Sequence, residues 1–243
     1  MGKKLIGIAT VLVVAAAGFG ASWLMFGQGK PPESSTPTAS QPAPQGFNKT
    51  QHDINEPGGL WWIVNKQRPL PKGYEPADLT TPKIKLRWAP IAESMQVSAS
   101  ITPSLEAMYQ AMVAAGFDVM LISGYRSEKT QAELYNGYVS KSGQAEADRL
   151  SARPGTSEHQ TGLVVDLGRA DGKCELDQCL GDLPEGKWLA EHAHEYGFII
   201  RYPQGKEATV GYMYEPWHLR YVGKELAAEL HAKQQTMEEF FGL

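Results

Sequence analysis

The chain has 243 residues, 42% of them hydrophobic, and carries a formal net charge of −4 at pH 7. This length and composition are typical of one medium-sized globular domain with additional segments. The acidic balance, with no long basic run after the first residues, argues against a nucleic-acid-binding protein.

The first residues predict a membrane segment. Lys3 and Lys4 precede an uncharged apolar run over residues 5–26, and about 20 apolar residues can cross a bilayer as a helix. We expect an uncleaved anchor, because a cleavable signal peptide usually has an apolar core of roughly 7–15 residues. Small residues within the run leave a cleaved segment as the alternative. The lysines predict that residues 1–4 are cytoplasmic and that the rest lies on the far side of the membrane, secreted if the segment is cleaved.

A stretch rich in Pro, Ser, Thr and Gln follows over residues 27–58 and predicts a disordered, extended linker. His52 lies in or beside this linker, where we expect it to be solvated. The folded domain is expected over residues 59–243. Its proline-rich strip at residues 68–76 must wrap over the domain, since prolines prevent a regular helix there.

The first half of the expected domain contains mainly helices. Thr102 is a typical N-cap residue with Pro103 at the first helical position, and Gly116 ends this helix. Ser127 is expected to cap the next helix. The remaining elements expected here are a hairpin around residues 83–98, a strand at 117–123, a helix at 128–140 and a short helix at 144–151.

Short strands are expected in the second half. Leu163, Val164 and Val165 form an apolar run between two glycines, which predicts a buried strand. Further strands are expected at 198–202 and 217–222, with helices at 187–196 and 224–239. Helices grouped early and late around short strands indicate an α+β fold with a small antiparallel sheet and flanking helices.

The chain has two cysteines, Cys174 and Cys179. In an exported chain, such a local pair most simply forms a disulfide that closes a small loop. Two free thiols are the alternative, and the spacing disfavours a metal-binding pair. We expect the bridge to stiffen its loop without taking part in chemistry.

A histidine and an aspartate in the stretch 153–168 indicate a metal site. His159 stands in a predicted loop, and Asp166 follows three aliphatic residues at the end of a predicted strand. A buried carboxylate there must be hydrogen-bonded, paired or bound to a metal. Imidazole and carboxylate are both ligand types that Zn²⁺ accepts, and such a site needs at least one further ligand.

His218 is the best third ligand among the six histidines of the chain. His192 and His194 are two residues apart on a predicted helix and face different sides, and His231 is expected at the surface of the last helix. His218 begins a predicted strand, and Glu215 precedes it by three residues at the strand entrance. Glu215 and His218 should therefore face the same cavity.

Three protein ligands with water at the fourth position are the pattern of a catalytic zinc site. Glu215 would then be the base that takes a proton from the attacking water. A His–x6–Asp pair is by itself more often structural, so spacing alone leaves a structural arrangement of these residues open.

Several stretches resemble the VanY-like D-alanyl-D-alanine carboxypeptidase family. Ser-Gly-Tyr-Arg-Ser at 123–127, followed by Gln131, is similar to the first family motif. The stretch 154–166 resembles the Ser-x-His-x-x-Gly-x-x-x-Asp metal motif, and 214–223 resembles the third motif. Residues 64–71 and 201–206 also look like family landmarks, so the resemblance covers roughly residues 60–230. Residues 209–211 depart slightly from the family pattern.

The resemblance implies a zinc carboxypeptidase domain at 59–243, not of the serine type. Its fold would be hedgehog/D-Ala-D-Ala-peptidase-like, with the zinc site at the sheet face. By residue, it implies zinc binding by His159, Asp166 and His218, catalysis by Glu215 and Arg126, and substrate binding by Arg126, Gln131 and Ser157. Arg126 would bind the terminal carboxylate of the substrate or the developing oxyanion; a salt bridge is its alternative. Gln131 and Ser157 could instead be a solvated helix residue and a loop cap. Ser157 and Glu158 would lie at the lip of the substrate cleft.

The expected activity is D,D-carboxypeptidase activity, in which metal-activated water releases the C-terminal D-alanine of a peptidoglycan stem peptide. The alternatives are an L,D-carboxypeptidase acting on tetrapeptide stems, a non-catalytic cell-wall-binding module and a structural zinc protein. A non-catalytic module would be free to lose Glu215, and a structural zinc site would want four protein ligands. The expected partners are peptidoglycan stem peptides and, through the N-terminal segment, a membrane; the protein is expected to be a monomer.

Overall fold

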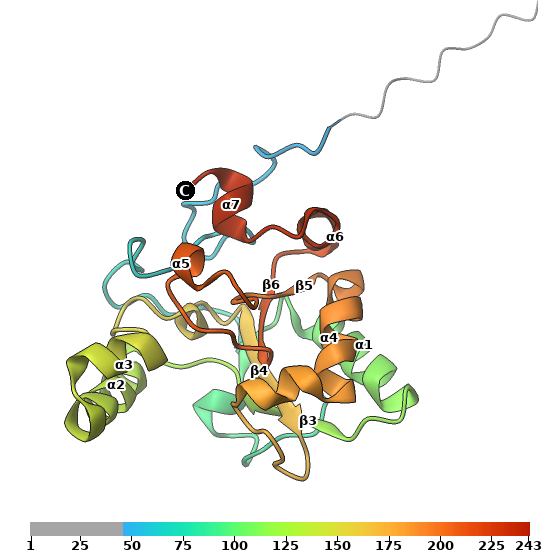
Figure 1. Cartoon of the computed structure of the whole chain (residues 1–243), viewed down its shortest axis with the longest axis horizontal. Helices are drawn as coiled ribbons and strands as arrows, with labels where there is room; N and C mark the ends of the chain where they lie inside the picture. Colours follow the sequence, from blue (N-terminus) through green and yellow to red (C-terminus); the bar gives the residue numbers. More distant parts are fainter. Residues whose placement is uncertain (1–45) are drawn as a thin grey trace, which may run out of the picture. The chain divides into compact units, whose positions relative to one another are not determined.

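The structure is a computed structural model, and it describes residues 46–243, which form one compact unit (Figure 1). The expected membrane segment at 5–26 and most of the expected linker lie outside the described residues. Within residues 46–243, none of the helices combines the length and the apolar character needed to cross a membrane.

The compact unit begins at Gly46, so the folded part starts before the expected boundary at Gly59. Phe47 stacks on Trp61 with ring centroids 5.5 Å apart, and His52 meets the same ring edge-on at 4.8 Å. His52 is therefore packed against the domain and does not lie in a solvated spacer. The polar composition of residues 46–58 concealed these aromatic contacts.

The main sheet is antiparallel and has four strands in the order β3-β4-β6-β5. A separate antiparallel pair, β1-β2, lies outside it. The bounds are β1 Leu79–Thr80, β2 Val97–Ser98, β3 Val119–Ser123, β4 Val164–Arg169, β5 Phe198–Ile200 and β6 His218–Tyr221. This arrangement confirms the expected α+β fold with a small antiparallel sheet.

The helices flank the sheet (Figure 1). Within residues 46–243, four 3-10 turns lie between the strands and helices: η1 Glu93–Met95, η2 Glu158–Thr161, η3 Gln178–Asp182 and η4 Ala193–Tyr196. The α-helices are α1 Thr102–Ala114, α2 Glu128–Ser142, α3 Gln144–Leu150, α4 Pro184–His192, α5 Glu207–Val210, α6 Lys224–Lys233 and α7 Met237–Phe241.

Alternation along β4 separates the hydrophobic core from the polar side of the sheet. Val165 and Leu167 belong to the largest core cluster, together with Met108 of α1 and Leu219 of β6. Successive side chains of a strand point to opposite faces, so Asp166 points to the face opposite this cluster. The apolar side of the sheet thus anchors the strand that presents the carboxylate.

Several predicted boundaries differ from the structure. β4 continues beyond its expected end at Asp166 and reaches Arg169. Gly168 does not end the strand; it leaves room for Ile122, whose Cγ1 would lie 2.9 Å from an added Cβ. The expected last helix is divided, because Gln234 adopts a φ of 52° and Thr236 caps the new helix α7. Polar residues at 234–236 were compatible with a helix, so the pattern did not reveal the break.

Other differences concern the first half and the loops. Ile101 occupies the N-cap of α1, and Thr102 is already helical. The expected hairpin at 83–98 is wrong, since β2 pairs with Leu79–Thr80. Ser127 does cap α2, accepting a hydrogen bond from the backbone N–H of Thr130. The helix expected at 187–196 begins earlier, at Pro184, and its last residues form the 3-10 turn η4. The short helix α5 was not expected.

The loop after β4 is closed by a disulfide between Cys174 and Cys179, whose Cα atoms are 5.6 Å apart. Glu175 within this loop forms an ion pair with Arg87 at 3.4 Å. The bridge therefore shapes a loop that also contacts the segment before β2.

Candidate metal centre

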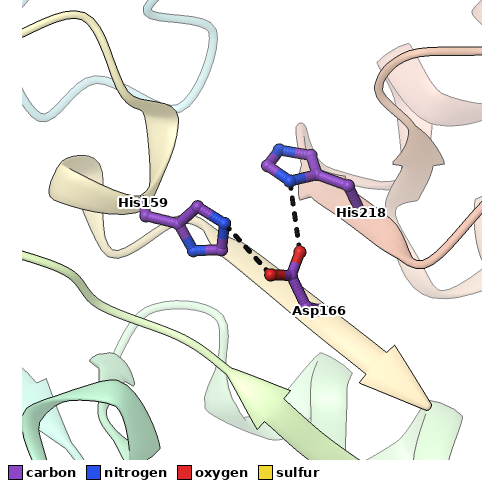
Figure 2. Close-up of side chains that lie close together, drawn as sticks. All are labelled: His159, Asp166 and His218. Carbon is purple, nitrogen blue, oxygen red and sulfur yellow. Dashed lines mark ion pairs between the residues drawn. The ribbon is translucent and has the colours of Figure 1, made fainter. Parts of the chain in front are cut away.

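Three side chains converge on one point at the polar face of the sheet (Figure 2). His159 Nε2 lies 3.3 Å from Asp166 Oδ2, and His218 Nδ1 lies 3.2 Å from Asp166 Oδ1. One ligand atom of each residue lies within 4.8 Å of the others. Across the described part of the chain, this is the one group of three or more side chains that could hold a metal ion.

The sheet register places two of the three ligands. Asp166 on β4 pairs directly with His218 on β6, so their side chains emerge side by side on the same face. Ser123 of β3 is the next partner of Asp166 across a register shift. Residues far apart in the sequence are thus brought together by backbone pairing alone.

A tight turn places the third ligand. His159 lies in η2, and its Nδ1 donates a hydrogen bond to the carbonyl oxygen of Gly124 at 2.6 Å. An added Cβ at Gly124 would lie 2.3 Å from the carbonyl oxygen of Gln96, so glycine is required where the chain passes. The hydrogen bond fixes the tautomer of His159 and leaves Nε2 free to bind a metal.

The donor set fits a divalent metal. Two imidazoles and a carboxylate are zinc ligand types, and a site of three protein ligands leaves one position open. Asp166 Oδ1 is buried and has no hydrogen-bond partner among the described residues. A buried carboxylate is costly without a positive partner, and a metal at this point would supply one.

The pKa values of the two histidines differ in direction. Burial and the charge of Arg126 lower the pKa of His159, which favours the neutral ring. Burial also lowers the pKa of His218, but its contacts with Asp166 and Glu158 outweigh burial and raise that pKa to about 9. A ligating imidazole is neutral. A metal bound at His218 Nδ1, the nitrogen that faces Asp166, would therefore replace the proton on that nitrogen.

Glu215 stands beside the three ligands. Its Oε2 lies 3.6 Å from His218 Nδ1, and its side chain is 14% exposed. Its backbone N–H donates to the carbonyl oxygen of Tyr202, which holds the segment before β6 in place. Burial raises the pKa of the Glu215 carboxyl to about 7.

Arg126 reaches the same site from the segment after β3. Its Nη1 donates to Gln131 Oε1 at 2.8 Å, and its Nη2 donates to Ser123 Oγ at 3.3 Å. Its backbone N–H donates to the carbonyl oxygen of His159. The guanidinium is therefore held by β3 and α2, and the backbone of Arg126 by the turn that carries a metal ligand.

Gln131 lies behind Arg126 and has no exposed surface. Its Nε2 donates to Ser151 Oγ at 2.9 Å and to the carbonyl oxygen of Ala152 at 2.7 Å. Its amide groups are thus used within the protein, and it orients Arg126. Ser157 is 3% exposed and directly precedes η2; its substrate-binding role stays a prediction.

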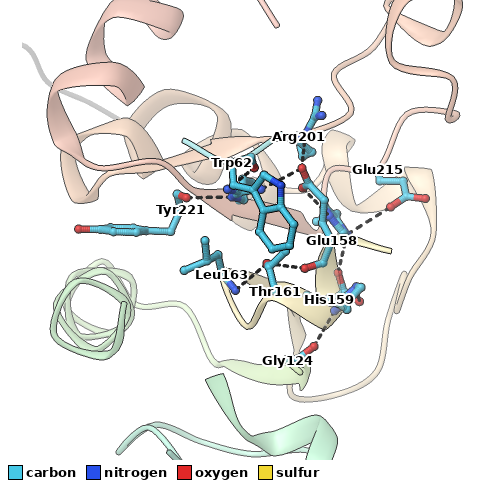
Figure 3. Close-up of polar contacts among 12 residues, drawn as sticks. Trp62, Gly124, Glu158, His159, Thr161, Leu163, Arg201, Glu215 and Tyr221 are labelled. Carbon is cyan, nitrogen blue, oxygen red and sulfur yellow. Dashed lines mark hydrogen bonds and ion pairs between the residues drawn. The ribbon is translucent and has the colours of Figure 1, made fainter. Parts of the chain in front are cut away.

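Glu158 does not lie at the lip of a cleft, and this expectation is wrong. The residue is 1% exposed, and its Oε1 accepts a hydrogen bond from Arg201 Nε at 2.9 Å (Figure 3). The same oxygen accepts a second hydrogen bond from Arg220 Nη1 at 3.0 Å. Arg201 also binds Glu238 of α7 through both terminal nitrogens. Sequence reasoning missed these partners, although an arginine inside or beside an apolar strand needs a buried acid.

His194 and His231 do not contribute to the centre. Their rings stack on each other with centroids 3.8 Å apart, between η4 and α6. His192 Nδ1 lies 2.9 Å from Glu195 Oε1. The stacking of His194 on His231 was not foreseen from the sequence.

Two imidazoles, a carboxylate, a second carboxylate and an arginine around one point are the groups of a metallohydrolase with one metal ion. A family model described as "D-alanyl-D-alanine carboxypeptidase", VanY, matches residues 94–224. The chain belongs to the VanY family and is a metallo-carboxypeptidase. The matched range contains the three candidate ligands, Glu215 and Arg126.

Curated relatives agree with this assignment. The chain is 39% identical over 188 residues to YodJ of Bacillus subtilis (strain 168), which is named, provisionally, as a carboxypeptidase; the match covers 77% of this chain and 69% of YodJ. It is 33% identical to the D-alanyl-D-alanine carboxypeptidase of Enterococcus faecalis (strain ATCC 700802 / V583), with 73% of this chain and 64% of that protein covered.

Solved structures share the fold. The LD-carboxypeptidase LdcB superposes with a TM-score of 0.73 at 39% identity, covering 76% of this chain and 87% of that one. A mutant of the vancomycin-resistance D,D-pentapeptidase VanY, solved in complex with Zn(II), superposes with a TM-score of 0.62 at 31% identity. The match covers 74% of this chain and 97% of the VanY chain. The neighbours thus confirm the zinc-peptidase fold.

Proposed function

We propose that this chain is a zinc-dependent D,D-carboxypeptidase that removes the C-terminal D-alanine from peptidoglycan stem peptides. One observation carries the proposal: the range that matches the D-alanyl-D-alanine carboxypeptidase family encloses the convergent His159, Asp166 and His218. Glu215 and Arg126 lie in the same range, so all the chemistry that the proposal needs is present.

The metal would be held by His159 Nε2, the Asp166 carboxylate and His218 Nδ1, the atoms that face one another. When bound, zinc supplies a Lewis acid that polarises the scissile carbonyl and makes water a stronger nucleophile at neutral pH. His159 keeps its orientation through Gly124, so the protein sets the geometry before substrate arrives.

Glu215 is proposed as the catalytic base. It is largely buried beside His218, with one edge exposed, so it can receive a proton from the attacking water. The same carboxyl then gives a proton to the amine of the departing D-alanine. This two-step role needs a carboxylate that is within reach of the metal ligands and free of strong protein hydrogen bonds.

Arg126 is proposed to bind the free carboxylate at the end of the substrate. A carboxypeptidase must recognise that terminus, and a guanidinium can bind a carboxylate with two parallel hydrogen bonds. Gln131 and Ser123 hold Arg126 in place. Stabilisation of the developing oxyanion is the other role open to Arg126.

An L,D-carboxypeptidase acting on tetrapeptide stems is the second candidate. It is supported by the greater likeness of this chain to the LD-carboxypeptidase LdcB, with 39% identity, than to the D,D-pentapeptidase VanY, with 31%. The same ligands and base serve both reactions, because the two substrates differ in the residue before the scissile bond.

Incubation of the zinc-loaded protein with pentapeptide and tetrapeptide stems, followed by mass spectrometry, tests the proposal. Loss of one D-alanine from the pentapeptide, with the tetrapeptide left intact, is the expected result. Loss of D-alanine from the tetrapeptide alone would establish the second candidate. Failure to cleave either stem by a protein with full zinc occupancy would overturn both and favour a cell-wall-binding module.

For the rest of the chain, we propose that residues 5–26 anchor the protein in a bacterial cell membrane. Residues 1–4 would be cytoplasmic. The stretch 27–45 would hold the catalytic domain at a distance from the outer face of the cell membrane, on the side where stem peptides are found. Cell fractionation tests this: the full chain should sediment with membranes, and deletion of residues 5–26 should release it. A soluble product shortened at its N-terminus would contradict the anchor and point to cleavage, and a full-length soluble protein would contradict any membrane role of residues 5–26.

A further inference from the structure

A buried cluster of four charged residues lies behind the metal centre, on the side of His218 that faces away from Asp166. Glu158, Arg201, Arg220 and Glu238 form this cluster, and we call it the ion cluster. Their side chains in the ion pairs are between 0% and 4% exposed. Two carboxylates and two guanidiniums balance in charge, and nothing in the catalytic proposal uses them.

The hydrogen bonds of the ion cluster leave one carboxylate oxygen unused. Glu158 Oε1 accepts from both Arg201 and Arg220. Glu158 Oε2 is buried and has no hydrogen-bond partner in the part of the chain that the structure describes, and the same is true of His218 Nε2. These two unpartnered atoms lie 3.9 Å from each other.

His218 offers only its Nδ1 to the metal side, since that atom lies 3.2 Å from Asp166 Oδ1. A neutral imidazole that binds a metal through Nδ1 must carry its proton on Nε2. A buried N–H needs an acceptor, and Glu158 Oε2 is the carboxylate oxygen that faces it. The separation is longer than a hydrogen bond, so the ring or the carboxylate must move closer for the bond to form.

We propose that Glu158 is a positioning residue that fixes the ring orientation and tautomer of His218 for metal binding, while Arg201 and Arg220 hold its carboxylate in place. The inference rests on the proposed zinc site. Metal-bound histidines commonly donate their second N–H to a carboxylate, which orients the ring and increases its basicity as a ligand. Here the orienting carboxylate comes from the residue next to the other histidine ligand, His159.

The alternative is that Glu158 only neutralises two buried arginines. Glu238 provides a matched control, because it is also a buried glutamate that binds Arg201. Its ion-pair contacts in the structure do not include His218. Glu158→Gln and Glu238→Gln therefore each remove one negative charge from the ion cluster, but only the first changes the acceptor that faces His218.

The test is the zinc dissociation constant of the wild type and both variants, measured by competition with a chromophoric chelator, with the melting temperature of each apoprotein. We expect Glu158→Gln to bind zinc roughly 10–100-fold more weakly and Glu238→Gln to bind within about twofold of wild type, while both apoproteins melt at lower temperature. Equal zinc affinity in the two variants would overturn the inference. A wild type that does not bind zinc would instead refute the proposed site itself.

A measurement on the wild type keeps the inference testable if Glu158→Gln does not fold. Long-range ¹H–¹⁵N NMR correlations of the zinc-loaded protein distinguish the two imidazole tautomers. We expect His218 to carry its proton on Nε2, protected from exchange with water, and His159 to carry its proton on Nδ1. A His218 ring bound to zinc through Nε2, or an Nε2 proton that exchanges as freely as one in solvent, would overturn the role of Glu158.

Discussion

Asp166 and His218 are direct partners across the ladder of β4 and β6, and Asp166 Oδ1 lies 3.2 Å from His218 Nδ1. Backbone pairing therefore sets the spacing of two metal ligands that are 52 positions apart in the chain, from 166 to 218. A ligand pair on adjacent strands is held by the hydrogen bonds of the sheet. The third ligand, His159, depends on a turn and on its bond to Gly124.

Removal of one ligand should abolish stable metal binding. In Asp166→Asn, the amide keeps the shape of the side chain but loses the negative charge that faces both histidines. We expect zinc affinity to fall by more than the roughly 10–100-fold that is typical for loss of an outer-shell partner. Zinc content after dialysis checks this. His192→Ala, a change on α4 away from the site, should keep full occupancy, and stoichiometric zinc in Asp166→Asn would refute the ligand set.

Replacement of the base should separate zinc binding from turnover. Glu215→Gln removes the proton acceptor but leaves all three ligands, so we expect unchanged zinc content and a kcat lower by about 10²–10⁴-fold. Turnover of the preferred stem peptide, measured with metal analysis of the same sample, checks both parts. Glu207→Gln, at an exposed position of α5, is the control. A metal-loaded Glu215→Gln that works at the wild-type rate would show that another group is the base.

The metal ligands could be predicted from the sequence because their chemistry is local. Asp166 follows an apolar run, where an unpaired carboxylate is too costly, and Glu215 precedes His218 by three residues. The family resemblance then connected these stretches to Arg126. The α+β class followed from the order of apolar segments, and the main strands lie where that order places them, within a few residues at their ends.

The ion cluster could not be predicted because its partners come from four separate segments. Glu158 was expected at a cleft edge because it precedes the proposed metal ligand His159 in the loop. Only the fold brings Arg201 to it from the residue after β5, Arg220 from β6 and Glu238 from α7. The break between α6 and α7 escaped prediction for a related reason, because α7 is placed by its burial of Met237 and Phe240.

Loss of the support behind Arg126 should weaken substrate binding. Gln131→Leu removes the acceptor for Arg126 Nη1, so the guanidinium loses its fixed orientation. Because the terminal carboxylate is bound in both ground and transition states, we expect KM to rise roughly tenfold, with kcat changed less. Steady-state kinetics check this, and Gln110→Leu on the exposed side of α1 is the control. A lower kcat at unchanged KM would assign Arg126 to the oxyanion instead.

The ion cluster should make the fold sensitive to acid. Burial raises the pKa of Glu238, but the charge of Arg201 and hydrogen bonds from Arg201 and Asn65 outweigh burial and hold that pKa below its ordinary value. The unfolded chain then binds a proton near pH ~4.3 while the folded protein does not. The stabilisation is present above that pH and is lost as the pH falls through the lower folded value.

Glu238→Gln tests this assignment, since glutamine does not titrate. We expect the variant apoprotein to be less stable than wild type at pH 7, by about 1–3 kcal/mol for a disrupted buried charged hydrogen bond. The difference should shrink as the pH falls below ~4.3. Urea unfolding of both apoproteins between neutral and acid pH measures it. A difference that stays constant with pH would mean that Glu238 has the same pKa in the folded and unfolded chains, contrary to its pairing with Arg201.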